Sequence, residues 1–172
     1  MNCIIVLGDN MKNIIIINGY GGSGKDTFVE LVSKYNKVYN FSSVDKVKEI
    51  AKIIGWNGEK DEKSRKFLSD LKKLTTDYND MPFNSIKDAL SDFYESDKEI
   101  MFIHIREPEE IKRAVLEFNA KTLFIKRDDI NKITSNSSDA SVENYNYDYI
   151  IENTTLEDLE ESAKNFYNLI NK

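Results

Sequence analysis

The sequence predicts an α/β fold in which a parallel sheet of five strands is covered by helices on both faces. Short apolar runs rich in β-branched residues alternate along the chain with longer stretches whose apolar residues recur at helical spacing. The clearest run is 14–17, four consecutive isoleucines, and the pattern after it places Phe28, Leu31 and Val32 on one helical face. An apolar strand without polar alternation is typical of a sheet that is buried on both sides.

The remaining elements follow from the same two patterns. Pro108 suits the first turn of a helix, and Thr155 with Asp158 has the pattern of an N-terminal helix cap. The helical stripe in 67–78 is expected to place Leu74 and Tyr78 on its buried side. Strands are expected at 14–18, 37–41, 100–105, 123–125 and 147–151. Helical stripes are expected in 28–35, 47–54, 67–78, 86–93, 111–118 and 159–170.

The length of 172 residues suits a single domain, expected over 13–172. Residues 1–12 are expected to form an N-terminal extension or an extra edge strand, with translation starting at Met1 or at Met11. The single cysteine, Cys3, excludes an internal disulfide and agrees with a cytoplasmic protein. The net charge of −6 argues against a nucleic-acid polymer as partner, and no apolar run approaches the roughly 20 residues of a membrane span.

The stretch 19–27 joins the first strand to the first helix and has the composition of an anion-binding turn. Gly19, Gly24 and Lys25 have the spacing G-x-x-x-x-G-K. Glycines let backbone N–H groups approach a phosphate, and the helix that follows adds its unpaired N–H groups and its positive dipole end. Lys25 supplies a cation for the outer phosphates. Thr27 supplies a hydroxyl for Mg²⁺, one place later than usual because Asp26 follows the lysine.

These features predict a site for ATP and Mg²⁺. The expected nucleotide-binding residues of this stretch are Gly19, Gly21, Gly22, Ser23, Gly24, Lys25, Asp26 and Thr27.

Charged residues at the ends of the expected strands are further candidates, because ligands of parallel sheets bind beyond the carboxyl ends of the strands. Two of the four arginines, Arg106 and Arg127, follow strands directly, and a guanidinium group binds phosphate through two hydrogen bonds. Together with Lys25, they are the expected catalytic residues. Asp45, Arg65 and Arg106 are the expected binding residues for a phosphate acceptor.

Several of these residues also have a purely structural interpretation. Asp45 could instead stabilise the start of a helix, and Arg65 could lie on an ordinary exposed face. His104 is the only histidine and occurs where many phosphate-transferring sheets carry an acidic partner of Mg²⁺. Its alternation within an apolar strand favours a core histidine. Glu107 could order Mg²⁺ directly or through water.

Taken together, these residues resemble the nucleoside monophosphate kinase superfamily. The stretch 19–27, with its hydroxyl two places after the lysine, is similar to the phosphate loop of that superfamily. Its Gly-Lys-Asp-Thr end particularly resembles deoxynucleoside monophosphate kinases of the phage type. The segments 41–48, 105–110, 127–139, 147–153 and 156–159 resemble further motifs in the same order. Dephospho-coenzyme A kinase is a related scaffold that fits nearly as well.

The resemblance implies a three-layer α/β/α P-loop kinase fold with a helical acceptor-binding insertion at 44–98 and a small lid at 128–146. It implies that the γ-phosphoryl group of ATP is transferred, with Mg²⁺, to a small phosphorylated acceptor, with a (deoxy)nucleoside monophosphate as the first choice. Asn153, just after the last strand, then joins the nucleotide-binding residues.

The chain departs from the family pattern at two points. His104 stands where the family has Asp, and 128–146 contains no arginine. These departures favour, as an alternative, a nucleotide-binding regulatory protein with weak or no transferase activity. A plain ATPase is a third hypothesis.

Overall fold

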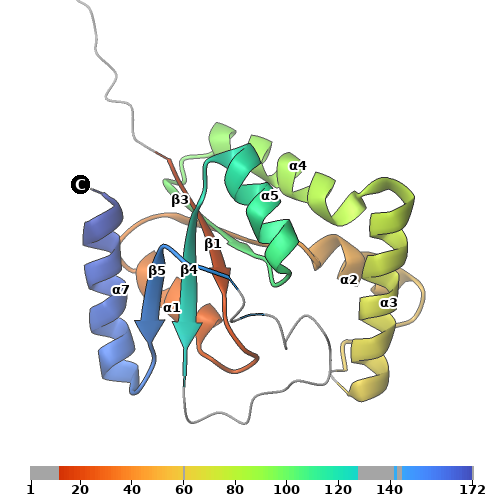
Figure 1. Ribbon diagram of the computed structural model, residues 1–172, viewed down its shortest axis with the longest axis horizontal. Helices are drawn as coiled ribbons and strands as arrows, with labels where there is room; N and C mark the ends of the chain where they lie inside the picture. Colours follow the sequence, from red (N-terminus) through yellow and green to blue (C-terminus); the bar gives the residue numbers. More distant parts are fainter. Residues whose placement is uncertain (1–11, 60, 128–141, 143–144, 172) are drawn as a thin grey trace, which may run out of the picture.

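A computed structural model describes residues 12–59, 61–127, 142 and 145–171 of the chain. Its strands form one parallel sheet in the order β2-β3-β1-β4-β5 (Figure 1), which confirms the predicted five-stranded sheet. The strands are β1 (Asn13–Asn18), β2 (Val38–Ser42), β3 (Ile100–His104), β4 (Lys121–Lys126) and β5 (Tyr149–Glu152). The helices are α1 (Lys25–Ser33), α2 (Asp45–Ile53), α3 (Glu62–Asn79), α4 (Met81–Glu95), α5 (Pro108–Phe118) and α7 (Leu156–Ile170).

Strand β1 lies in the middle of the sheet, and its isoleucines alternate between two hydrophobic clusters. Ile15 and Ile17 pack with residues of α1 and α7 on one face, where the rings of Phe28 and Phe166 meet edge to face with centroids 5.6 Å apart. Ile14 and Ile16 pack with residues of α4 and α5 on the other face. The uninterrupted isoleucine run is therefore explained by burial on both sides, and the three layers follow from it (Figure 1).

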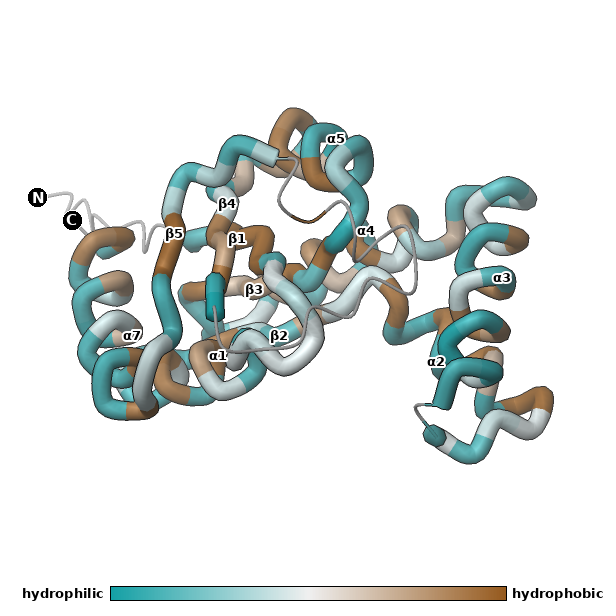
Figure 2. The backbone as a smooth tube through the Cα atoms, turned by 60° about the horizontal axis from the view of Figure 1, so that its bottom comes forward, coloured by the Kyte–Doolittle hydropathy of each residue, from teal (hydrophilic) through white to brown (hydrophobic). Residues whose placement is uncertain are grey.

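Helices α2 and α3 lie beside the sheet rather than over it, as Figures 1 and 2 both show. The prediction that Leu74 and Tyr78 of α3 are buried is wrong, because their exposed fractions are 65% and 85%. Helix α3 contains no fully buried residue, and it packs mainly against α2 and α4. The helical period correctly predicted an apolar stripe on α3, but the helices that pack against α3 cover only part of that stripe.

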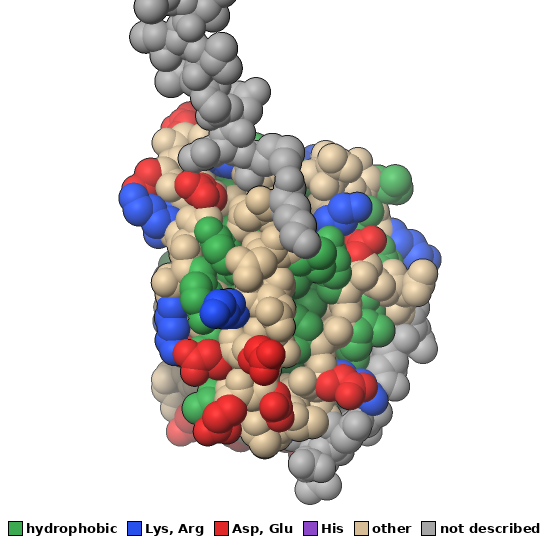
Figure 3. Space-filling model, turned by 90° about the vertical axis from the view of Figure 1, so that its left-hand side faces the viewer, with side chains coloured by type: hydrophobic (Ala, Val, Ile, Leu, Met, Phe, Trp, Pro, Cys, Tyr) green, Lys and Arg blue, Asp and Glu red, His purple; other side chains and the backbone are tan. Residues whose placement is uncertain are grey.

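Local signals explain several of the boundaries. Helices α3 and α4 are separated by Asp80, whose backbone has a φ of 56° and whose carboxylate accepts from Arg113 at 2.5 Å. The predicted cap of the last helix is confirmed, since the Asp158 amide donates to the Thr155 hydroxyl at 3.1 Å. The first turn of α7 is acidic, and Figure 3, seen from the side on which α7 lies, shows acidic side chains gathered on the lower part of this face.

Two predicted regions fall largely outside the described residues. The extension or edge strand at 1–12 is described only at Lys12, and the lid at 128–146 only at residues 142, 145 and 146. Both therefore stay predictions. In the part of the chain that the structure describes, no helix is long and apolar enough to cross a membrane.

Candidate functional site

The glycines of the turn between β1 and α1 allow other backbone segments to come unusually close. A Cβ atom at Gly19 would lie 2.4 Å from the carbonyl oxygen of Ile125, and one at Gly24 would lie 2.4 Å from Nδ2 of Asn153. Both glycines also have positive φ, at 146° and 95°. The turn therefore packs directly against the end of β4 and against the segment that follows β5, which only glycine permits.

The N-terminal end of α1 presents its backbone N–H groups at this turn. The hydrogen-bond ladder of the helix begins with the Phe28 amide, which donates to the Gly24 carbonyl at 2.8 Å. The amides at the start of α1 precede that bond, and an α-helix offers its first amides no acceptor of its own. Gly24, the N-cap residue, makes no side-chain capping bond. These amides and the positive dipole end of the helix form a site that favours an anion.

The Lys25 ammonium group lies across the turn rather than in bulk solvent. Its Nζ donates to the carbonyl oxygens of Gly19 and Tyr20, each at 2.7 Å. The lysine thus fixes the turn while its charge stays beside the N-terminal amides of α1. An anion bound at those amides would meet this cation directly.

A cavity of about 400 Å³ opens beside the turn. Asn153 forms part of its wall and joins two neighbouring segments: its backbone amide donates to Lys126 at 2.7 Å and its side chain donates to the Ser23 carbonyl at 2.9 Å. Two buried polar atoms of this region, Oγ of Ser23 and Nε of Arg127, have no hydrogen-bond partner among the described residues. Buried polar atoms usually have partners, and a polar ligand in the cavity could serve as one for Arg127, which lines it. The cavity is lined by Gly22, Gly24, Lys25, Asp26, Thr27, Arg127, Asn153, Thr154, Thr155, Leu156 and Leu159.

The predicted arginines are separated by the order of the strands. Arg127 follows β4 and lines the cavity. Arg106 follows β3, on the other side of β1, and its carbonyl oxygen accepts from the Asn18 side chain at 3.2 Å. The turn after β1 therefore has one arginine-bearing segment on either side.

The predicted acceptor residues lie on the β2–β3 side of the turn. Asp45 begins α2, accepts from the Ser42 amide at 3.0 Å and lies 3.0 Å from the Lys48 ammonium, as the structural interpretation expected. Arg65 is an exposed residue of α3. Asp45 is therefore held by its own neighbours, whereas Arg65 lies on a helix beside the sheet.

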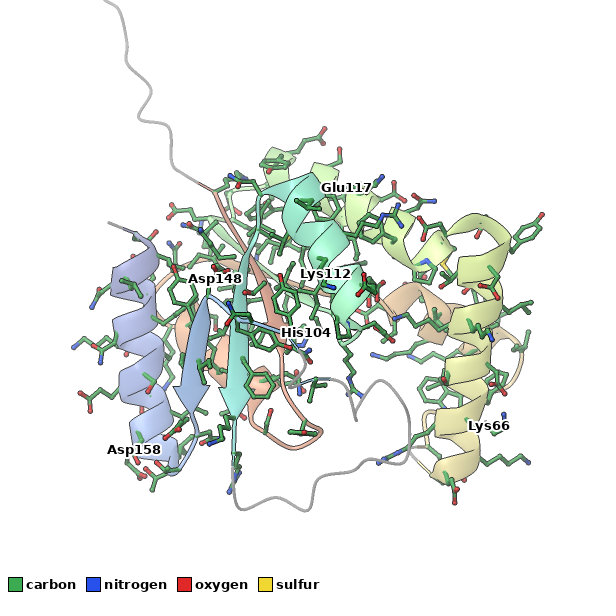
Figure 4. All side chains as sticks on the ribbon, viewed as in Figure 1. Lys66, His104, Lys112, Glu117, Asp148 and Asp158 are labelled. Carbon is green, nitrogen blue, oxygen red and sulfur yellow. The ribbon has the colours of Figure 1, made fainter. Side chains whose placement is uncertain are left out.

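His104 ends β3 beside Ile17 of β1 and Ser42 of β2, near the middle of the view in Figure 4. It is half-buried, and its Nε2 atom lies 2.8 Å from the side-chain oxygen of Asn40. Burial lowers the pKa of His104 to about 4, with Asp26 acting in the opposite direction. The prediction of a core histidine therefore holds only in part: the imidazole is neutral at pH 7, but it lies at the carboxyl edge of the sheet.

The sequence did not reveal a triad of charged groups beside Arg106. Nζ of Lys72, on α3, lies 2.7 Å from Glu107 and 2.9 Å from Glu110 at the start of α5. Burial raises the pKa of Glu110 to about 7, and the charge of Glu107 acts in the same direction. Glu107, a candidate for ordering Mg²⁺, instead pairs with this lysine. We call Lys72, Glu107 and Glu110 the Lys72 triad.

Comparison with known proteins supports the fold. No protein-family model matches the chain, and no curated protein matches it. Among solved structures, a sugar kinase from Janibacter sp. HTCC2649 has 12% identity and a TM-score of 0.56, covering 92% of this chain and 95% of its own. Dephospho-CoA kinase from Campylobacter jejuni has 19% identity and a TM-score of 0.50, covering 93% of this chain and 98% of its own.

These likenesses, together with the glycine-rich turn and the parallel sheet, define the fold class. The chain has the α/β fold of the P-loop kinases, with helices on both faces of a five-stranded parallel sheet. The predicted fold is therefore confirmed. The finer resemblance, to deoxynucleoside monophosphate kinases of the phage type, stays a prediction.

Proposed function

We propose that this protein is a kinase that transfers the γ-phosphoryl group of ATP to a small phosphorylated acceptor, with a (deoxy)nucleoside monophosphate as the first class to test. One observation carries the proposal. The N-terminal amides of α1, the Lys25 ammonium and Arg127, whose Nε has no partner among the described residues, lie together at a cavity of about 400 Å³. That set of donors is the chemistry needed to hold a polyphosphate.

Each part of the site has a role in such a transfer. The backbone N–H groups of the turn would bind the β-phosphate, and Lys25 would exchange its carbonyl partners for oxygens of the β- and γ-phosphates. Mg²⁺ would neutralise charge on the phosphates when bound. Thr27, with Asp26 next to it, is the residue that would hold it, because Mg²⁺ takes oxygen ligands from few side chains and from the phosphates themselves. Arg127 would bind the nucleotide from the cavity side.

The transfer itself needs alignment more than covalent help from the protein. An oxygen of the acceptor phosphate forms a bond to the γ-phosphorus, the bond from that phosphorus to the β–γ bridging oxygen breaks, and ADP leaves with the electron pair. Arg106, on the β3 side of the turn, would stabilise the charge on the moving group, and Asp45 and Arg65 would contact the acceptor. Asn153 would keep the turn against the cavity wall.

The test is ADP formation from ATP and Mg²⁺ in the presence of a panel of nucleoside monophosphates and dephospho-coenzyme A. We expect ADP only when one acceptor is present, and a loss of several orders of magnitude in turnover for Lys25→Ala. Lys34→Ala is the matched control, because Lys34 is exposed at the other end of α1 and pairs with Glu160. Unchanged turnover in Lys25→Ala would refute the proposal.

A nucleotide-binding regulatory protein is the second candidate. Its basis is His104 at the position where the resembled family has Asp, whereas the kinase-fold structures do not favour it. This candidate predicts tight ATP binding without turnover for any acceptor. A plain ATPase would instead release inorganic phosphate without an acceptor.

A further inference from the structure

Asn18 is a buried polar residue whose hydrogen bonds reach three separate segments. It ends β1 directly after the isoleucine run, and its exposed fraction is 0%. A buried amide is costly unless its polar atoms are paired. Its oxygen accepts from the Gly19 amide at 2.8 Å, and its Nδ2 donates to the Arg106 carbonyl at 3.2 Å and to the Tyr147 hydroxyl at 2.7 Å.

Both sides of the Gly19 peptide unit are therefore fixed by side chains. Asn18 accepts from its N–H, and Lys25 donates to its carbonyl oxygen at 2.7 Å. Gly19 is the first residue of the turn that the proposed function assigns to the phosphates. Asn18 thus fixes where that turn leaves the sheet.

The same amide fixes the segment that carries Arg106. The donated bond goes to the backbone carbonyl of Arg106, so it holds the base of the side chain and does not involve the guanidinium group. Nδ2 has two hydrogens, and each has an acceptor. Because both hydrogens are already in hydrogen bonds and the residue is buried, Asn18 does not itself contact a nucleotide.

The third bond leads to an aromatic cluster. The Tyr147 hydroxyl donates to the Val142 carbonyl at 2.7 Å, and its ring stacks on Phe124 with centroids 4.9 Å apart. Tyr20, from the glycine-rich turn, packs in the same cluster. Burial raises the pKa of Tyr147 to about 12, so its hydroxyl remains protonated at neutral pH. The bond to Tyr147 therefore holds the Asn18 side chain against this aromatic cluster.

We infer that Asn18 is a positioning residue that sets the Arg106 segment relative to the phosphate-binding turn, and that it acts on phosphoryl transfer through Arg106. This inference rests on the proposed function. The Arg106 carbonyl and the Gly19 amide are bound to one rigid side chain, so a shift of one carries over to the other. Alignment of this kind affects the transfer step more than the binding of ATP.

Asn18→Asp tests the inference because it keeps the oxygen for the Gly19 amide and removes both donors. We expect kcat to fall about tenfold or more, since a buried hydrogen bond is lost and its acceptor is left unpaired. We expect the Kd of ATP, measured by calorimetry with Mg²⁺, to stay within about threefold of wild type. If Asn18→Asp does not fold, Asn18→Ala takes its place with the same expectation for kcat; its Kd for ATP is not compared, because Ala also removes the acceptor of the Gly19 amide.

Two further variants separate positioning from general stability. Tyr147→Phe removes the hydroxyl that accepts from Asn18 and donates to Val142, but it leaves the Asn18 bonds to Gly19 and Arg106 in place. We expect its kcat to stay within about twofold even if its melting temperature falls. Arg106→Lys lowers kcat by itself, and the double variant of Asn18→Asp with Arg106→Lys should lose little beyond that, because residues that act through one another are not additive.

The outcomes separate the inference from the proposed function. Additive losses in the double variant, or equal losses of kcat in Asn18→Asp and Tyr147→Phe, would overturn the role of Asn18 alone. A wild-type protein that binds no ATP, or that forms no ADP with any acceptor, would overturn the proposed function and the role of Asn18 with it.

Discussion

The Lys72 triad should make the stability of the protein depend on pH near neutrality. One ammonium group faces two carboxylates, and the side chains of Lys72 and Glu110 are each only 16% exposed. The pKa of Glu110 is about 7 in the folded protein, against an ordinary value of 4.5. Between these two values the folded protein keeps a proton that the unfolded chain has released. The contribution of Glu110 to the free energy of unfolding therefore falls as pH rises through this window.

The size of the effect follows from the same two values. A difference of one unit between the pKa values of the folded and unfolded states corresponds to about 1.4 kcal/mol in the free energy of unfolding. For Glu110 this gives an upper limit of about 3 kcal/mol. Glu107 shares the ammonium of Lys72 and part of the titration, so we expect about 2 kcal/mol. Glu110→Gln keeps the shape of the side chain and removes its charge. Its free energy of unfolding should match wild type near pH 5 and exceed it by about 2 kcal/mol at pH 8.

The assay is urea unfolding followed by circular dichroism at several values from pH 5 to pH 8. The difference between variant and wild type is the quantity to use, because it cancels the titration of all other groups. Glu109→Gln is the matched control, since Glu109 is 86% exposed and pairs with Lys112 at the surface. We expect it to follow wild type throughout. A constant difference for Glu110→Gln, or a loss of stability at pH 8, would refute the reasoning.

Three other changes test the structure more locally. Wild type should lose about 1–2 kcal/mol of stability as pH falls from 6.5 to about 4, because burial lowers the pKa of the half-buried imidazole of His104 to about 4 and its protonation opposes folding. His104→Gln should remove this loss, and unfolding curves at pH 4.5 and 7 measure the difference. Gly24→Ala should lower stability by about 1–3 kcal/mol and abolish the rise in melting temperature with ATP, since its Cβ would lie 2.4 Å from Asn153. Thr155→Ala should cost about 1 kcal/mol of thermal stability, because the Asp158 amide loses its capping acceptor; an unchanged melting temperature would contradict this assignment.

The fold could be predicted from the sequence because each of its main signals is local. Four isoleucines in a row allow little besides a strand buried on both faces, and β1 is such a strand. The glycines and the lysine that follow belong to one continuous stretch, so their chemistry was readable before any packing was known. The cap at Thr155 is similarly a short-range pattern.

The remaining features depend on contacts between distant parts of the chain. Asn18 and Tyr147 are 129 residues apart, and Lys72 and Glu107 are 35 apart, so no spacing rule connects them. Leu74 shows the same limit in another way, because the helical period identifies an apolar stripe but does not say whether another element covers it.

The order of the strands explains why two arginines at similar strand ends have different surroundings. The chain runs from β1 to β2 and β3 on one side of β1 and then crosses to β4 and β5 on the other side, so the turn after β1 lies at the point where the direction of winding reverses. Ligands of such sheets bind at that point. Arg127, the cavity and Asn153 then lie on the β4–β5 side, whereas Arg106, His104 and Asp45 lie on the β2–β3 side. The proposed transfer would use this division to bring nucleotide and acceptor together over one turn. Asn18, with bonds to both the turn and the Arg106 segment, lies where the two sides join.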